Sequence, residues 1–152
     1  MATTIQPAAV QAQRAEYPTG ALLALRLLAM AGSITFFVWT LLHLGVQIPL
    51  GFLVLSEPFS PPALIVEALC GLALGVGAVA LLTRQRRAWD LLFGGHLLAF
   101  GGVTLGMIAL ALVPGPRSLS NDIYHIFINV VLVINLVLLQ RPGVRETIEM
   151  QA

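Results

Sequence analysis

The stretch from Pro62 to Thr83 reads PALIVEALCGLALGVGAVALLT, an apolar run in which Glu67 is the only charged residue. Three further runs of similar character span Ala21–Val46, Trp89–Val113 and Ile123–Gln140. Each run has the roughly 18–20 residues that an α-helix needs to cross a hydrocarbon core of ~30 Å. Lipid cannot hydrogen-bond an exposed backbone, so such runs predict spanning helices. The sequence therefore predicts an all-α membrane protein, an antiparallel four-helix transmembrane bundle.

The composition agrees with a chain embedded in lipid. Of its 152 residues, 58% are hydrophobic and 10% are charged, whereas soluble domains usually carry about 25% charged residues. The net charge of +1 gives no reason to expect nucleic-acid binding. We expect residues 18–141 to form one transmembrane domain, residues 1–17 a disordered or interfacial cytoplasmic tail, and residues 142–152 a second cytoplasmic tail.

The distribution of arginine predicts the orientation in the membrane. Basic residues lie before the first span, between the second and third, and after the fourth: Arg14, the Arg84-Gln85-Arg86-Arg87 loop, Arg141 and Arg145. Arg117 is the only basic residue between spans on the opposite side. The positive-inside rule then places both termini and the arginine loop of this multi-pass membrane protein in the cytoplasm. Trp39, Trp89 and Tyr124 lie near span ends, where aromatic belts occur.

Ionisable residues inside a membrane are costly and suggest function. Counting ~1.5 Å per residue places Glu67 about 8 Å below the outer end of the second span. His43 and His125 lie near the outer ends of the first and fourth spans, and Cys70 shares a helix face with Glu67. We predict that these four residues form an outer polar cluster, suited to binding a transition metal, passing protons or hydrogen-bonding a quinone head group.

A second cluster is predicted near the inner side. The same count places Arg26 about 9 Å and His96 about 10 Å from the inner ends of their helices, and Asp90 begins the helix of His96. Arg26 is long enough to bridge the other two, or to snorkel to the cytoplasmic interface.

Metal and haem are weaker alternatives. The sequence contains no HxxxH, ExxH or CxxC spacing, so we assign no metal ligands. A haem held by two histidines needs them at matching depth, which only His43 and His125 satisfy.

Glycine pairs mark sites of close helix contact. Gly71 and Gly75 form a GxxxG motif in the second span, and Gly102 and Gly106 form another in the third. Such motifs let backbones approach closely in lipid, either within the bundle or across a homo-oligomer interface.

The second span resembles the second helix of DoxX-type bacterial membrane proteins, which carries a Glu followed by a Gly four residues later. The run ending Leu82-Thr83-Arg84 is similar to that family's turn into helix three, and Leu22-Leu-Ala-Leu-Arg26 is similar to its first helix. The resemblance carries over to six residues: Arg26, Glu67, Gly71, Gly75, Thr83 and Arg84. The lysine that family members often show at the end of helix one is missing here, where His43-Leu-Gly45-Val-Gln47 stands.

The resemblance implies a four-helix protein of the bacterial inner membrane, associated with quinone-linked oxidoreductases and redox stress. We therefore expect an accessory or quinone-contacting subunit of a membrane oxidoreductase, whose partners are the lipid bilayer and other subunits. The alternatives are a small transporter or channel, with an outer vestibule lined by the Glu67 cluster and an inner gate formed by Arg26 and His96, and a membrane metal or haem protein.

Overall fold

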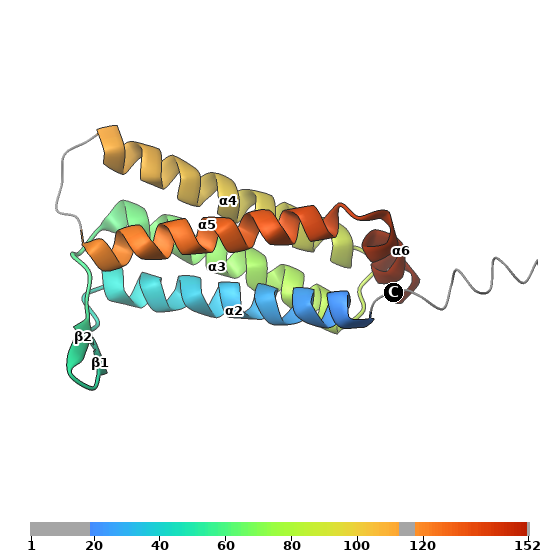
Figure 1. Ribbon diagram of the computed structural model, residues 1–152, viewed down its shortest axis with the longest axis horizontal. Helices are drawn as coiled ribbons and strands as arrows, with labels where there is room; N and C mark the ends of the chain where they lie inside the picture. Colours follow the sequence, from blue (N-terminus) through green and yellow to red (C-terminus); the bar gives the residue numbers. More distant parts are fainter. Residues whose placement is uncertain (1–18, 113–117, 152) are drawn as a thin grey trace, which may run out of the picture.

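The computed structural model describes residues 19–112 and 118–151, and the tail expected over residues 1–17 lies outside them. Four long helices follow one another along the chain: α2 (Thr19–His43), α3 (Pro61–Leu82), α4 (Ala88–Leu112) and α5 (Leu119–Leu139). Each is long and apolar enough to cross a membrane. Successive helices run in opposite directions, and α3 packs between α2 and α4 (Figure 1). The predicted antiparallel four-helix membrane bundle is confirmed.

The two ends of the bundle differ. At the hairpin end, α2 connects to α3 through a short antiparallel hairpin of β1 (Ile48–Leu50) and β2 (Leu53–Leu55). Phe52 at its tip is 96% exposed, and the hairpin extends sideways from the bundle (Figure 1). The opposite end, which we call the loop end, holds the α3–α4 connection and a further, short helix, α6 (Pro142–Gln151).

The segment after residue 141 was expected to be a tail, and it forms helix α6 instead. Val144 and Ile148 are buried against the bundle, four residues apart on one face. Arg145 on the exposed face pairs with Glu149 and lies over the Trp89 ring, 4.3 Å from its centroid. The segment is mainly polar, so the sequence did not indicate that Val144 and Ile148 would anchor it to the bundle.

The fourth span begins at Leu119, four residues before the predicted start at Ile123. Ser118 is its N-cap, and its Oγ accepts a hydrogen bond of 3.1 Å from the Asn121 N–H. The cap draws Leu119 and the polar residues 120–122 into the first turn of the helix. His125 therefore lies one turn deeper than its predicted position.

The core contains two apolar clusters and the surface is lipid-like. Leu25, Leu81, Leu92 and Leu139 are among the residues buried towards the loop end, and Phe36, Leu74, Ala99 and Leu132 among those towards the hairpin end. Large aliphatic side chains on the outward faces of all four long helices are about half exposed. This surface suits lipid and not water.

Glycine sets the distance between α3 and α4. A Cβ added at Gly77 would lie 2.7 Å from Leu92 Cα, and one added at Gly95 would lie 2.7 Å from the Ala73 carbonyl oxygen. The backbones of the two helices touch at these points. Neither glycine belongs to the GxxxG motifs identified in the sequence.

Most of the GxxxG glycines lie in contacts between helices of the same chain. Gly71 and Gly75 face Phe36 and Ser33 of α2, and Gly102 faces Cys70 and another side chain of α3. Only at Gly106, among these four, would an added Cβ meet nothing within 4 Å. The first three therefore pack neighbouring helices of one chain.

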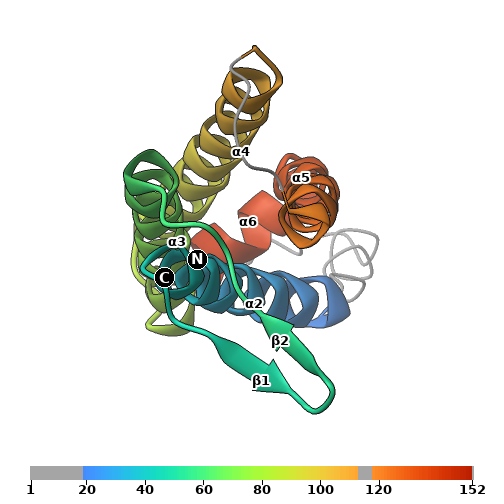
Figure 2. The same cartoon turned by 90° about the vertical axis from the view of Figure 1, so that its left-hand side faces the viewer.

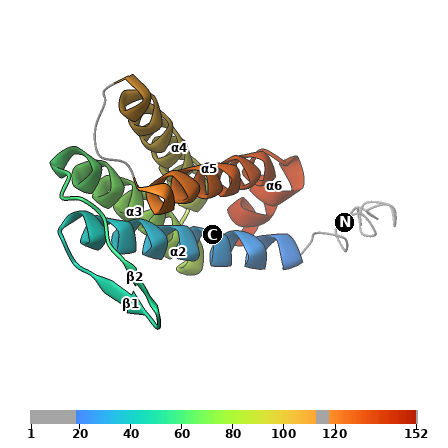
Figure 3. The ribbon, with the colours of Figure 1, turned by 60° about the vertical axis from the view of Figure 1, so that its left-hand side comes forward.

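The C-terminal part of α4, at the hairpin end of the bundle, diverges from α5 (Figures 2 and 3). Leu105, Ile108 and Leu112 along this part of the helix are exposed. This divergence opens a cleft between α4 and α5 beside His125.

Candidate functional site

Glu67 lies in the bundle interior, with 2% of its surface exposed. It is six residues into α3, about 9 Å along the helix from its start at the hairpin end. Two imidazoles approach the same carboxylate oxygen. His43 Nε2 at the end of α2 is 3.6 Å from Glu67 Oε1, and His125 Nε2 in the second turn of α5 is 3.9 Å from it. Three of the four residues predicted for the outer cluster therefore converge.

Backbone hydrogen bonds fix how the imidazoles face the carboxyl group. His43 Nδ1 is 3.1 Å from the Pro58 carbonyl oxygen, and His125 Nδ1 is 2.8 Å from that of Asn121. A carbonyl oxygen only accepts, so each Nδ1 carries a proton and donates it. In the neutral form, each Nε2 then presents a lone pair to Glu67.

The polar atoms at the centre of this cluster lack hydrogen bonds. Both Glu67 carboxyl oxygens, His43 Nε2 and the Tyr124 hydroxyl are buried without a partner among the described residues. The distances of 3.6 and 3.9 Å exceed the 2.7–3.2 Å of an N–H···O hydrogen bond. Buried polar groups are nearly always satisfied, so a proton on Glu67, a bridging water or a ligand atom would complete these contacts.

Aromatic rings form one wall of the site. Tyr124 stacks on Trp39 with ring centroids 4.2 Å apart, meets Phe36 edge-on, and lies beside the His125 ring. Trp39 and Tyr124 are both buried. Their expected role in an aromatic belt at the membrane surface is therefore wrong, because each ring packs into the core. The sequence signal was their position near the ends of the first and fourth spans, at the depth of the histidines.

A second carboxylate fixes the loop that carries Pro58. Glu57 is buried and accepts hydrogen bonds of 2.6–2.7 Å from the hydroxyls of Ser118 and Ser120. These contacts tie the segment before α3 to the start of α5. They thereby position two carbonyl groups at once: that of Pro58, which accepts from His43, and that of Asn121, which accepts from His125. Glu57 was not among the predicted cluster residues, because it lies in the loop before the second span and not within a span.

The cleft between α4 and α5 reaches the site from the lipid side. It has a volume of about 270 Å³ and is lined by Met107, Leu110, Ala111, Asp122, His125 and Ile126. His125 belongs to both the cleft and the Glu67 cluster. Because Nδ1 is held by the Asn121 carbonyl, Nε2 is the atom of His125 that can take a proton from a molecule in the cleft and release it to the buried carboxyl group.

Cys70 does not join the histidines around Glu67. Its Sγ lies 4.0 Å from the Ala99 carbonyl oxygen and packs against Gly102, in the interface between α3 and α4. Its burial in an apolar contact is typical of a structural cysteine.

The predicted inner cluster does not form. Arg26 donates a hydrogen bond of 3.0 Å to Gln151 Oε1 of α6. Asp90 is exposed, and the fully buried His96 directs its Nδ1 to the Leu92 carbonyl oxygen at 2.7 Å. Similar positions along two helices did not bring the three side chains together, because each makes different contacts.

Within the described residues, no group of three His, Cys, Asp or Glu side chains is arranged as a metal centre. No protein-family model, curated protein or solved structure matches the chain. The geometry of the Glu67 cluster and of the cleft beside it is therefore the evidence for function.

Proposed function

We propose that the protein is an accessory, quinone-contacting subunit of a membrane oxidoreductase, in which Glu67, His43 and His125 exchange protons with the quinone head group. The observation that carries this proposal is the pair of imidazoles that face one carboxyl oxygen without hydrogen-bonding it. Such a cluster holds a proton in more than one place, either on Glu67 or on one of the two Nε2 atoms.

The cleft suits a lipid-soluble ring. A cavity of about 150 Å³ accepts benzene, so about 270 Å³ accommodates a substituted six-membered ring. Apolar side chains line most of the cleft, and Asp122 and His125 supply its polar groups. A quinone enters such a site from the bilayer, and a quinol offers hydroxyl protons to those polar groups.

The protons and electrons of the reaction separate at this site. Oxidation of a quinol releases two protons and two electrons. The Glu67 cluster is placed to receive protons through His125, and the electrons pass to a redox centre of a partner subunit. This division of labour fits the resemblance to DoxX-type proteins in the second span, where Glu67 is the shared carboxylate. An inner-membrane location with the arginine loop in the cytoplasm belongs to the same proposal.

Quinone binding is testable with the purified full-length chain. Trp39, which stacks on Tyr124 beside His125, reports on the site through its fluorescence. We expect a short-chain ubiquinone or menaquinone analogue to quench this fluorescence saturably. A quench that rises linearly with quinone, without saturation, would refute the proposal.

A matched pair of variants locates the binding site. Ala111→Phe fills the cleft and should weaken quinone binding at least tenfold. Ala109→Phe adds the same side chain two residues earlier, at an exposed position outside the cleft lining, and should leave binding unchanged. Equal affinities in the two variants would show that quinone does not use the cleft.

Proton exchange has its own signature. Infrared difference spectra recorded as the bound quinone is reduced should contain a carboxyl band from Glu67 that disappears in Glu67→Gln. Because Gln is nearly isosteric, the fold should be kept. An unchanged band in this variant would assign the proton to another group and refute the role of Glu67.

The transporter alternative finds less support in the structure. Between the Glu67 cluster and the loop end, the buried side chains are mainly apolar, among them Leu74, Ala78, Ala99 and Leu132. Arg26 and His96, the predicted inner gate, hydrogen-bond to other groups and not to each other. Among the described residues, the buried polar side chains in this region, Ser33, His96 and Asn135, form no hydrogen bond with one another.

A further inference from the structure

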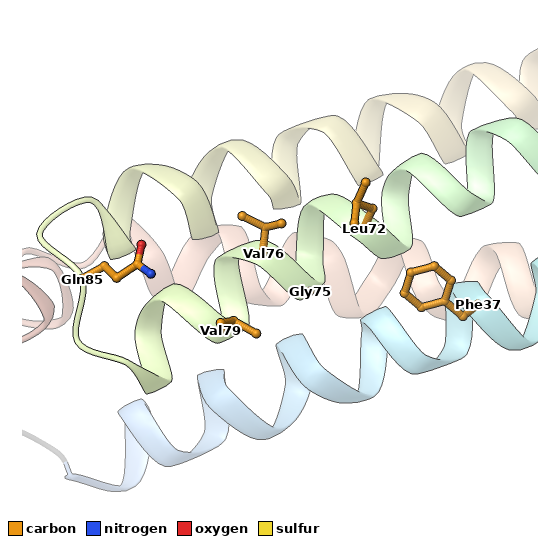
Figure 4. Close-up of a pocket in the computed structure, with 6 residues that line it drawn as sticks. All are labelled: Phe37, Leu72, Gly75, Val76, Val79 and Gln85. Carbon is orange, nitrogen blue, oxygen red and sulfur yellow. The ribbon is translucent and has the colours of Figure 1, made fainter.

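A shallow apolar groove lies between α2 and α3 on the lipid-facing surface, away from the Glu67 cluster. It has a volume of about 310 Å³ and is lined by Phe37, Leu72, Gly75, Val76, Val79 and Gln85. Figure 4 shows these residues in a row along α3, with Phe37 at one end and Gln85 of the α3–α4 loop at the other. Gly75 leaves the middle of the groove without a side chain.

The length of the groove matches one leaflet. The helix α3 ends at Leu82, so Val79 lies about 5 Å and Leu72 about 15 Å from the loop end of that helix. Half of a ~30 Å hydrocarbon core is about 15 Å. The groove therefore extends from the head-group boundary to the bilayer midplane, which is the depth of one acyl chain.

Unpaired positive charge lies at the head-group end of this groove. Arg84, Arg86 and Arg87 flank Gln85 in the α3–α4 loop and are all exposed. None of them forms a salt bridge with another described residue. Arginine clusters beside a span attract anionic lipid head groups, and the planar guanidinium hydrogen-bonds phosphate with two donors.

The backbone at Arg84 is an unusual place for this side chain. Arg84 has a φ of +54°, in the left-handed region, and the following Gln85 N–H donates a 2.9 Å hydrogen bond to the Ala80 carbonyl oxygen. This bond closes the end of α3 in a motif that normally places glycine at the left-handed position. The turn would form with less strain if residue 84 were glycine. The arginine therefore contributes nothing to the turn that glycine would not supply.

We infer that the α2–α3 groove and the arginine loop form a binding site for one anionic phospholipid, with an acyl chain in the groove and the phosphate on the arginines. The site faces the leaflet on the loop side of the membrane. It is independent of the proposed quinone site, which lies between other helices at the hairpin end.

Native mass spectrometry of the delipidated full-length protein tests this inference. Dioleoyl phosphatidylglycerol and dioleoyl phosphatidylcholine have the same chains and differ in net charge. We expect phosphatidylglycerol to bind at least tenfold more tightly. Each arginine near an anionic surface contributes ~1 kcal/mol, so Arg84→Gly should weaken phosphatidylglycerol binding about fivefold. The same variant should keep or raise the melting temperature, because glycine relieves the strained turn.

Two controls separate the head-group and acyl-chain contacts. Arg141→Gln removes an exposed arginine at the same end of the bundle but outside the groove, and should change binding less than twofold. Val76→Phe should weaken binding at least threefold by filling the groove, whereas Val130→Phe at an exposed position of α5 should not. Equal affinity for the two lipids, or a loss in Arg141→Gln as large as in Arg84→Gly, would overturn the inference. So would equal binding by the two phenylalanine variants.

Discussion

Replacing Gly95 by alanine should drive α3 and α4 apart, whereas the same change at Gly94 should not. A Cβ at residue 95 would lie 2.7 Å from the Ala73 carbonyl oxygen and 3.0 Å from its carbonyl carbon. A Cβ at residue 94 would meet nothing within 4 Å. The two glycines are adjacent in α4, so the pair compares one methyl group on two faces of the same helix.

The expected difference in unfolding free energy follows from two terms. Alanine is favoured over glycine inside a helix by about 1 kcal/mol, and this gain is common to both variants. At residue 95 alone, the backbone of α3 must move by about 0.7 Å to restore ordinary contact at 3.4 Å. Overpacking of this kind costs ~1–3 kcal/mol. We therefore expect Gly95→Ala to be less stable than Gly94→Ala by ~1–3 kcal/mol.

Unfolding in sodium dodecyl sulfate, followed by tryptophan fluorescence, measures this difference. Trp39 is buried near the hairpin end and Trp89 packs near the loop end, so the signal covers the whole bundle. Gly77→Ala, whose Cβ would lie 2.7 Å from Leu92 Cα, should repeat the loss on the other helix. If Gly94→Ala and Gly95→Ala unfold at the same detergent concentration, the predicted close contact between the backbones of α3 and α4 at Gly95 is refuted.

Three further predictions concern the ends of the bundle. Ser118→Ala should lower the free energy of unfolding by about 1 kcal/mol, because α5 loses its cap and Glu57 loses a donor. The control Ser56→Ala, at an exposed position, should have no effect, and equal melting temperatures of the two variants would contradict the prediction. Gln151→Ala should cost about 1 kcal/mol by removing the acceptor of Arg26, and equal melting temperatures of Gln151→Ala and the exposed control Gln140→Ala would contradict that contact. In a Cys70→Ala background, Gln85→Cys should resist an impermeant thiol reagent in intact cells and Ser56→Cys should react, whereas the reverse pattern would invert the proposed orientation.

The spans and their order could be predicted from the sequence because lipid imposes a simple length rule. Four apolar runs of sufficient length leave few alternatives to four helices. The ends were less certain: the cap at Ser118 moved the start of α5 four residues earlier than predicted. Helix α6 was missed because it has only two buried apolar residues, too few to distinguish a short packed helix from a polar tail.

The candidate site was predicted in part, and the reason is geometric. Counting residues gives the depth of a side chain in the membrane, and Glu67, His43 and His125 do lie at one level and meet. The same count grouped Arg26 with Asp90 and His96, but depth does not give the direction in which a side chain leaves its helix. Arg26 points to α6, an element that the sequence did not reveal.

The close contact between α3 and α4 shows a further limit of the sequence. GxxxG spacing selected four glycines, yet the two nearest backbone approaches are at Gly77 and Gly95. In a chain with 14 glycines, a spaced pair arises easily, and spacing alone does not say which face of a helix meets a neighbour. Only the packed bundle identifies the glycines that a methyl group would disrupt.

Two residues stand out because the fold would be more stable without them. Glu67 places a carboxyl group in the core with neither oxygen hydrogen-bonded, and an unsatisfied buried group costs ~1–3 kcal/mol. Arg84 holds a left-handed backbone conformation that glycine would adopt with less strain. Departures from local structural rules of this kind concentrate at functional sites. Glu67 is the centre of the proposed quinone site, and Arg84 lies at the head-group end of the proposed lipid site. Substitutions that improve stability at these two positions should therefore be the ones that remove function.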